Sequence, residues 1–183
     1  MQRLRGPVKG KILFLSADGA LYWAYETVSR PIVKISSINN MRGAEGVSFG
    51  ELTTCERHAQ AALIIAMVER LDDKAKREYI EAAFGRRLSK DDLTVVVFLG
   101  CSALGFGLEK TGVVHKMVKG YFDGSMTHRD IRRALGCRDQ YAVMVRRCLY
   151  ETLDIIHDRA MADMTEVLER HGLIRMAAST AYI

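Results

Sequence analysis

The sequence predicts a mainly α-helical fold: a helical bundle that carries a C-terminal helix-turn-helix and a long final helix, after a short irregular or extended N-terminal segment. Three observations predict it. The composition, 49% hydrophobic and 27% charged, is that of a globular chain. Apolar residues recur at helical spacing from residue 53 onward, and a single Leu-Gly-Cys break interrupts an arginine-rich helical stretch at residues 126–149.

The N-terminal segment, residues 1–52, is expected to hold little regular structure. Its start is basic and contains glycines, and a short helix is predicted over Ala20–Ser29, ending before Pro31. Residues 31–39 alternate β-branched and polar side chains, which predicts an extended segment. Three glycines within residues 41–51 predict a loop.

Two helices with apolar faces are predicted between residues 53 and 84. The first covers Cys55–Arg70, with Thr54 as its N-cap. Its inward residues by helical spacing are Ala61, Ile64, Ile65, Val68 and Leu71. The second covers Lys74–Phe84, and its inward residues are Tyr79, Ile80, Ala83 and Phe84.

The next stretch is ambiguous from sequence. Residues 94–108, TVVVFLGCSALGFGL, are β-branched enough for a buried strand and long enough for a core helix. Their helical neighbours favour a helix, beginning near Ser89, that breaks up at the glycines. GFGLEKTG at residues 105–112 lacks the glycine spacing of a phosphate-binding loop, so a connection is expected there.

The remaining elements complete a helical domain over residues 53–172, followed by a tail over residues 173–183. A short helix is predicted over Val113–Tyr121, and Asp123–Ser125 reads as a turn. A final helix is predicted from Tyr141 to about Arg170. Gly172 is its expected stop, and the tail is expected to attach loosely.

The most informative stretch is MTHRDIRRALGCRDQYAVMVRRCL, residues 126–149, which reads as one basic helix or as two helices that meet at a turn. The apolar spacing favours two helices, because Gly136 suits a tight turn and Cys137 suits the space between the helices. Thr127 and Asp139 are the expected caps. The inward residues are Ile131 and Leu135, then Ala142, Val145 and Leu149.

This arrangement predicts an arginine-rich outer surface. Residues 127–150 contain six arginines and two aspartates, whereas residues 151–170 contain six acidic residues and two arginines. Local basic charge suits contact with nucleic acid, in which arginine and glutamine bind base edges and further arginines bind phosphates. The candidate DNA-binding residues are Arg129, Arg132, Arg133, Arg138, Gln140, Tyr141, Met144, Arg146 and Arg147.

The order of the segments resembles the late-gene antitermination proteins, the Q proteins of lambdoid and related phages. The resemblance covers residues 55–170 through ERHAQAALIIAMVERL, DDKAKREYIEAAFG, GYFDG and MTHRDIRRALGCRD, of which only the last is specific. Members carry a helix-turn-helix similar to region 4 of sigma factors. The resemblance implies a factor that binds a promoter-proximal DNA site, loads onto paused bacterial RNA polymerase and suppresses termination. Double-stranded DNA and the polymerase are the implied partners, with the sigma subunit as a further candidate.

A dimeric helix-turn-helix repressor or activator of phage or bacterial origin is the alternative. Such proteins commonly dimerise to match the symmetry of their operator. Leu153, Ile156 and Ala160 of the acidic final helix are then the expected dimer face.

No enzymatic activity, metal or cofactor is expected. His58, Glu78, His115 and His128 are the available acid-base groups, and no pair of them has catalytic spacing. The cysteines Cys55, Cys101, Cys137 and Cys148 form no CxxC pair, which favours buried free thiols over a zinc site.

No apolar run approaches the roughly 20 residues of a membrane span, and no signal-peptide cleavage site follows the start. A cytoplasmic protein without membrane contact is therefore expected.

Overall fold

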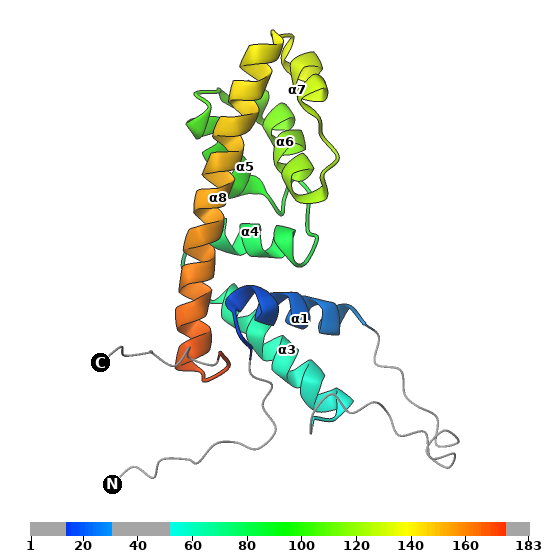
Figure 1. Ribbon diagram of the computed structural model, residues 1–183, viewed down its shortest axis with the longest axis vertical. Coiled ribbons are helices and arrows are strands. Elements are labelled where there is room, and N and C mark those ends of the chain that lie inside the picture. Colours follow the sequence, from blue (N-terminus) through cyan, green and yellow to red (C-terminus); the bar gives the residue numbers. More distant parts are fainter. Residues whose placement is uncertain (1–13, 31–51, 175–183) are drawn as a thin grey trace, which may run out of the picture. The chain divides into compact units, whose positions relative to one another are not determined.

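The computed structural model describes residues 14–30 and 52–174, and this part of the chain is mainly α-helical, as predicted (Figure 1). Its elements are α1 (Ala17–Ser29), α3 (Thr54–Glu69), α4 (Lys74–Ala83), α5 (Thr94–Ala103), the 3-10 turn η1 (Leu108–Lys110), α6 (Thr111–Asp123), α7 (His128–Leu135) and α8 (Asp139–Arg170). The described residues contain no strand. The predicted extended segment at 31–39 and the loop at 41–51 lie outside the described residues.

The chain forms two compact units: unit 1 comprises residues 1–67 and 164–183, and unit 2 comprises residues 68–163. The described core of unit 1 includes the fully buried Leu21, Ile64 and Leu168. Helix α1 begins three residues before the predicted start, because the Ser16 hydroxyl accepts a hydrogen bond from the Gly19 N–H at 3.2 Å and caps the helix.

The first two residues of the predicted tail are packed rather than loosely attached. Leu173 and Ile174 are buried. The Phe14 N–H donates to the Leu173 carbonyl at 2.8 Å, and the Phe14 ring lies 5.3 Å from the ring of Trp23. Residues near the two ends of the described chain therefore share one core in unit 1.

Helix α3 is capped by Thr53, one residue before the predicted cap. The Thr53 hydroxyl accepts from the Glu56 N–H at 3.3 Å, and the Glu56 carboxylate accepts from the Thr53 N–H at 2.7 Å. This reciprocal pair is a capping box. Of the predicted inward residues, Ala61, Ile64, Val68 and Leu71 are buried, whereas Ile65 is half-buried and Met67 is buried beside them.

Helix α4 follows a cap at Asp73, whose carboxylate accepts from the Ala75 N–H at 2.9 Å. The predicted inward Tyr79 and Ile80 are buried. The prediction for Ala83 is wrong: it is exposed, and Ala82 is buried instead. A shift of one residue turns a helix by about 100°, so spacing alone places the edge of an apolar face poorly.

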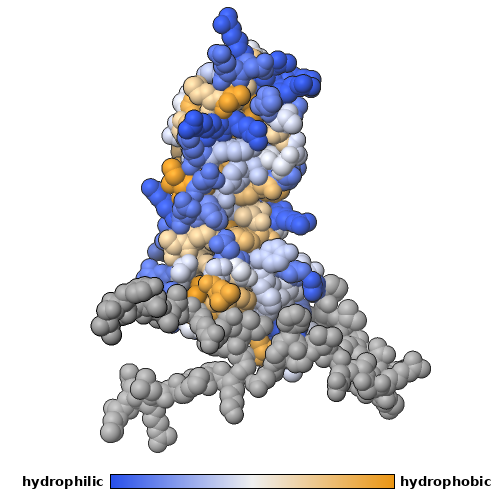
Figure 2. Space-filling view, in the orientation of Figure 1, coloured by the Kyte–Doolittle hydropathy of each residue, from blue (hydrophilic) through white to orange (hydrophobic). Residues whose placement is uncertain are grey.

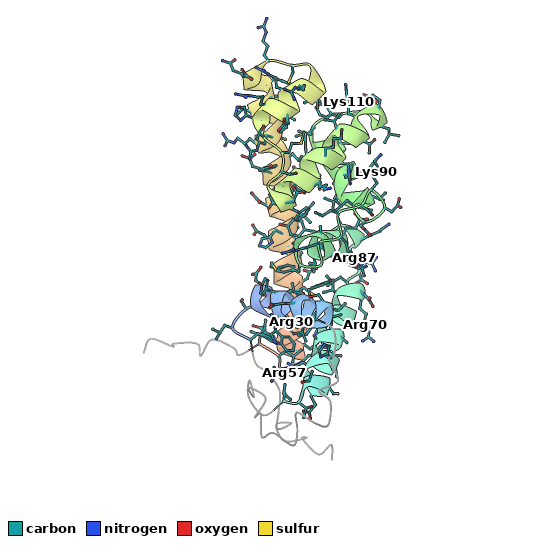
Figure 3. All side chains as sticks on the ribbon, turned by 90° about the vertical axis from the view of Figure 1, so that its right-hand side faces the viewer. Arg30, Arg57, Arg70, Arg87, Lys90 and Lys110 are labelled. Carbon is teal, nitrogen blue, oxygen red and sulfur yellow. The ribbon has the colours of Figure 1, made fainter. Side chains whose placement is uncertain are left out.

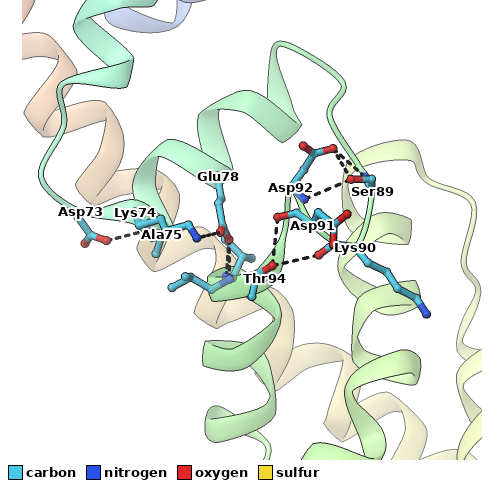
Figure 4. A network of polar contacts seen from close by, with 11 residues as sticks. Asp73, Lys74, Ala75, Glu78, Ser89, Lys90, Asp91, Asp92 and Thr94 are labelled. Carbon is cyan, nitrogen blue, oxygen red and sulfur yellow. Dashed lines mark hydrogen bonds and ion pairs between the residues drawn. The ribbon is translucent and has the colours of Figure 1, made fainter.

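Helix α5 resolves the ambiguous stretch in favour of a helix, and its cap comes from α4. No side chain at Leu93 caps it. Instead the carboxylate of Glu78, only 5% exposed, accepts from the N–H groups of Val95 and Val96 at 2.7 and 2.9 Å (Figure 4). Lys74 Nζ lies 3.7 Å from the other carboxylate oxygen. The buried charge is thus placed at the positive end of a helix dipole.

The core of unit 2 lies among α4, α5, α6, α7 and α8. Helix α5 packs against α4 and α6. Gly100 permits close packing, because a Cβ at this position would lie 2.8 Å from Leu149 Cδ1. The buried cluster comprises Tyr79, Ala82, Leu93, Val96, Val97, Cys101, Val114, Met117, Val118, Ile131, Ala142, Val145, Leu149, Leu153 and Ile156.

Helix α8 contains 32 residues and ends before Gly172, which has a φ of 63° as expected of a helix stop. None of the described helices alone has both the length and the apolar composition of a membrane span. Thr94–Ala103 and Leu108–Asp123 meet both criteria when they are counted together, but the pair is bent by 120°.

The cap at Glu78 gives a testable expectation for stability. Replacement Glu78→Gln should lower the free energy of unfolding by about 1.5–3 kcal/mol, because it replaces the charged acceptor of a buried and a part-buried N–H group by a neutral one. Urea denaturation measures this. Glu69→Gln, at an exposed position, is the control and should change stability by less than about 0.5 kcal/mol. Equal effects of the two variants would contradict the cap.

Candidate nucleic-acid interface

The arginine-rich stretch forms two helices joined by a tight turn. Residues 136–138 separate α7 from α8. Gly136 has a φ of 62°, in the left-handed region that favours glycine, and its N–H donates to the Arg132 carbonyl. The Cys137 N–H donates to the same carbonyl at 3.2 Å. The predicted break at Gly136 is confirmed, and a single continuous helix is excluded for this stretch.

The inward residues of both helices meet in the core of unit 2. Ile131, Ala142, Val145 and Leu149 are buried, as their spacing predicts. Leu135 and Cys137 are partly buried and pack against the same cluster. The turn therefore holds α7 against the first turns of α8 by apolar contact, which leaves the charged side chains of both helices outside.

The start of α7 carries a capping box. The Thr127 hydroxyl and N–H both donate to the Asp130 carboxylate, at 2.7 and 3.0 Å, and the Asp130 N–H lies 3.4 Å from the Thr127 hydroxyl. Thr127 is therefore the cap that its sequence predicts. The hydrogen bonds from Thr127 lower the pKa of the Asp130 carboxyl, and the nearby Arg133 and Arg129 lower it further.

Asp139 does not cap α8, contrary to prediction, because it lies inside the first turn of the helix. The helix begins two residues earlier than predicted, and the Arg138 carbonyl accepts from the Ala142 N–H at 3.1 Å. The Asp139 carboxylate instead accepts from Arg132 Nη1 at 3.1 and 3.3 Å. This exposed ion pair bridges the turn and neutralises one of the predicted DNA-binding arginines.

The start of α8 presents polar and apolar side chains to solvent. Gln140 is exposed, and so are Tyr141, Val143 and Met144, at 42%, 53% and 57%. Val143 was not among the predicted DNA-binding residues. Its exposure agrees with the helical spacing, which places Ala142, Val145 and Leu149 inward and Val143 on the outer face.

Arg146 and Arg147 are held by neighbours on α8. The Arg146 guanidinium lies 4.9 Å from the centroid of the Tyr150 ring, and that ring packs edge-on against Tyr121 at 4.9 Å. Arg147 Nε donates to Glu151 at 2.7 Å, and this hydrogen bond raises the pKa of the Arg147 guanidinium. An exposed pair of this kind contributes little energy, so a phosphate can replace the carboxylate.

Arg129 and Arg133 on α7 and Arg138 in the turn form a distinct set, termed the arginine set below. All three are exposed, and among the described residues none of their guanidinium groups makes a hydrogen bond or ion pair, although Arg129 and Arg133 lie near the Asp130 carboxylate. Figure 2 shows mainly hydrophilic side chains, with small hydrophobic spots, at the end of unit 2 where α7 meets α8. The surface thus combines an excess of positive charge with exposed groups on α8.

The cysteines differ from the prediction of buried thiols. Cys101 is buried, and burial raises the pKa of its thiol, but Cys55 is exposed and Cys137 and Cys148 are half-buried. The Cys148 thiol donates to the Ala103 carbonyl at 3.6 Å. Within the described ranges no three His, Cys, Asp or Glu side chains gather in a way that could hold a metal ion.

The dimer face proposed for the alternative function is not available at the surface. Leu153, Ile156 and Ala160 are buried within the chain. The first two belong to the core cluster of unit 2. Apolar residues at helical spacing can pack against the chain's own core or against a second copy of the chain, so their spacing in the sequence could not distinguish the two.

The capping box predicts how α7 responds to mutation and pH. Thr127→Ala should lower the free energy of unfolding by about 1 kcal/mol at neutral pH, whereas Thr127→Ser should retain most of the stability. Because the pKa of Asp130 is lowered by folding, its contribution is present at neutral pH and is lost as the pH falls through that lowered value. Urea denaturation at neutral and acidic pH measures both effects; an undiminished Thr127→Ala effect in acid would contradict the box.

Comparisons of the chain with protein-family models, with curated proteins and with solved structures give no match. The resemblance to the antitermination proteins therefore stays a prediction from the sequence. The function is argued below from the geometry of α7, the turn and α8.

Proposed function

We propose that the protein is a DNA-binding transcription regulator in which α7, the turn and α8 contact duplex DNA. The observation that carries this proposal is the arginine set. Three exposed guanidinium groups that make no ion pair among the described residues lie on α7 and in the turn, before the exposed start of α8. A protein surface of this kind binds the phosphate backbone with release of counterions.

The start of α8 is the element proposed to enter the major groove, which is wide enough for an α-helix. Gln140 can bind both the N6 and N7 atoms of adenine through its amide. Val143 and Met144 supply apolar contacts for a thymine methyl group. These exposed side chains are proposed to give sequence preference.

The arginine set is proposed to contact phosphates on either side of this groove. Such contacts fix the register of the protein on DNA but carry little sequence information. Arg132 and Arg147 are already paired with Asp139 and Glu151, and we assign them a secondary contribution through exchange of carboxylate for phosphate.

The regulator is further proposed to be an antitermination factor that binds RNA polymerase and makes it read through terminators. This part rests on the resemblance of residues 55–170 to the Q proteins, within which the arginine-rich stretch is the specific segment. We do not propose the dimeric repressor, because its expected dimer face is buried in the core.

Removal of the arginine set tests DNA binding. The triple variant Arg129→Gln, Arg133→Gln and Arg138→Gln should weaken binding to duplex DNA by about 1 kcal/mol or more for each charge. The slope of log K against log salt should fall by about 3. Fluorescence anisotropy with labelled duplex at several salt concentrations measures both quantities.

A matched control separates the arginine set from total charge. The triple variant Arg70→Gln, Arg86→Gln and Arg159→Gln removes the same charge from exposed positions elsewhere in unit 2. It should retain most of the affinity and salt dependence. If both triple variants bind DNA equally, the assigned surface is wrong.

A transcription assay tests the antitermination proposal separately. With purified RNA polymerase on a template that carries a DNA site for this protein and a downstream terminator, the wild-type protein should raise the fraction of transcripts that pass the terminator. The arginine-set variant should not. Retention of the polymerase on immobilised protein, without DNA, measures the partner contact. DNA binding without read-through and without polymerase retention would leave a DNA-binding regulator but reject antitermination.

A further inference from the structure

The side of α8 that faces away from the core of unit 2 carries a short stripe of side chains. Glu151, Ile155 and Arg159 follow one another at intervals of four residues, so they share one face of the helix. All three are exposed, and Ile155 is 52% exposed. The half-buried Cys148 and the exposed Ala162 lie seven residues to either side of Ile155. These five residues are termed the outer stripe below.

The exposed face of α5 is apolar and uncharged. Phe98 and Leu99 are 58% and 36% exposed. Residues 93–108 contain no charged side chain. The nearest lysines, Lys90 and Lys110, flank this segment in the sequence and are labelled on one side of unit 2 in Figure 3. Solvent is therefore in contact with large apolar side chains of α5 that no charged neighbour on the same helix covers.

Helix α5 lies beside the outer stripe. The Cys148 thiol donates to the Ala103 carbonyl at 3.6 Å. A Cβ at Gly100 would lie 2.8 Å from Leu149 Cδ1, so the two helices are in close contact. The exposed apolar side chains of α5 and Ile155 of α8 thus belong to neighbouring helices, and burial of such a surface against another protein favours association.

The outer stripe is complementary in charge to its own reverse. Glu151 and Arg159 lie four residues before and four residues after Ile155. When two copies of α8 pack antiparallel with Ile155 against Ile155, each Glu151 lies opposite Arg159 of the second copy, and Cys148 lies opposite Ala162 of the second copy. A parallel pair would place like charges opposite each other, which is unfavourable.

Both charged residues of the stripe are available for such pairs. The Arg159 guanidinium makes no hydrogen bond or ion pair among the described residues. Glu151 accepts from Arg147 at 2.7 Å, but the two side chains are 59% and 80% exposed, so this pair contributes little and can be exchanged. Asp158, beside the stripe, would lie opposite the uncharged Thr152 of the second copy.

We propose that the outer stripe and the exposed face of α5 form a symmetric interface with a second copy of this chain, in which two α8 helices pack antiparallel around Ile155. Two Glu151–Arg159 pairs fix the register, and the apolar side chains of α5 add buried area on one side of the stripe. This interface lies on the other side of α8 from the buried Leu153 and Ile156. It is independent of DNA binding by α7 and α8.

The dimer places its two arginine sets far apart. Arg138 precedes Ile155 by 17 residues, so at about 1.5 Å per residue the two sets lie about 51 Å from each other. Dimeric helix-turn-helix repressors place their recognition helices about 34 Å apart, so this dimer does not restore the repressor. A duplex shorter than about 15 base pairs reaches one arginine set only, and binding measured on such a duplex does not depend on the dimer.

Sedimentation velocity of the full chain between about 1 and 200 µM tests the interface. The wild-type protein should dimerise with a Kd on the order of 10 µM. Ile155→Asp should raise this Kd at least about tenfold, because it places two carboxylates at the centre of the interface. Leu108→Asp, at a 73% exposed apolar residue outside the stripe and α5, is the matched control and should leave the Kd unchanged.

An exchange of charge tests the antiparallel register. Glu151→Arg alone and Arg159→Glu alone should each stay monomeric, because like charges then face each other in both pairs. An equimolar mixture of the two variants should form a heterodimer, because both charge pairs are restored between them.

Three results would each overturn the proposal: a wild-type protein that is monomeric at about 200 µM, equal dimerisation of Ile155→Asp and Leu108→Asp, or a mixture of the two charge variants that stays monomeric. Every substituted residue is exposed, so each variant should fold. Circular dichroism measures whether each retains the helical content of the wild type.

Discussion

The left-handed turn at Gly136 is the constraint on which the arrangement of unit 2's charged end depends. A φ of 62° ends α7 and redirects the chain, so that Ile131 of α7 and Ala142 and Val145 of α8 enter the same core. A residue with a Cβ is strained in this conformation. If the chain continued as one helix, the apolar residues on either side of the break could not both face the core, and the arginines would not gather around one turn.

The surface charge of unit 2 depends on which acidic side chains are already hydrogen-bonded or ion-paired within the chain. Glu78 is buried and serves as the cap of α5, Asp130 completes the capping box of α7, and Asp139 and Glu151 each hold an arginine. These acids are occupied locally. The arginine set makes no ion pair among the described residues, so the charged end of unit 2 keeps an excess of positive charge on which an anion is favoured.

Much of the fold follows from local rules in the sequence, and the exceptions have physical causes. Helical spacing identified the buried face around Gly136 and the residues Ala142, Val145 and Leu149, because a narrow apolar stripe leaves one solution. It failed at Ala83, at the edge of a stripe, and at Leu153, where the stripe faces the chain's own core rather than a partner. It could not anticipate Glu78, which caps a helix 17 residues away in sequence.

The exposure of the arginine set has a consequence for how this protein can change. The side chains of Arg129, Arg133 and Arg138 are exposed and make no hydrogen bond or ion pair among the described residues, so folding depends little on their identity. Gln140 and Met144 are exposed in the same way. Substitutions at these positions can therefore accumulate at little cost in stability. The helices and their turn act as a permanent scaffold, on which a selection experiment could vary the outer side chains and recover new binding preferences while the folded core stays the same.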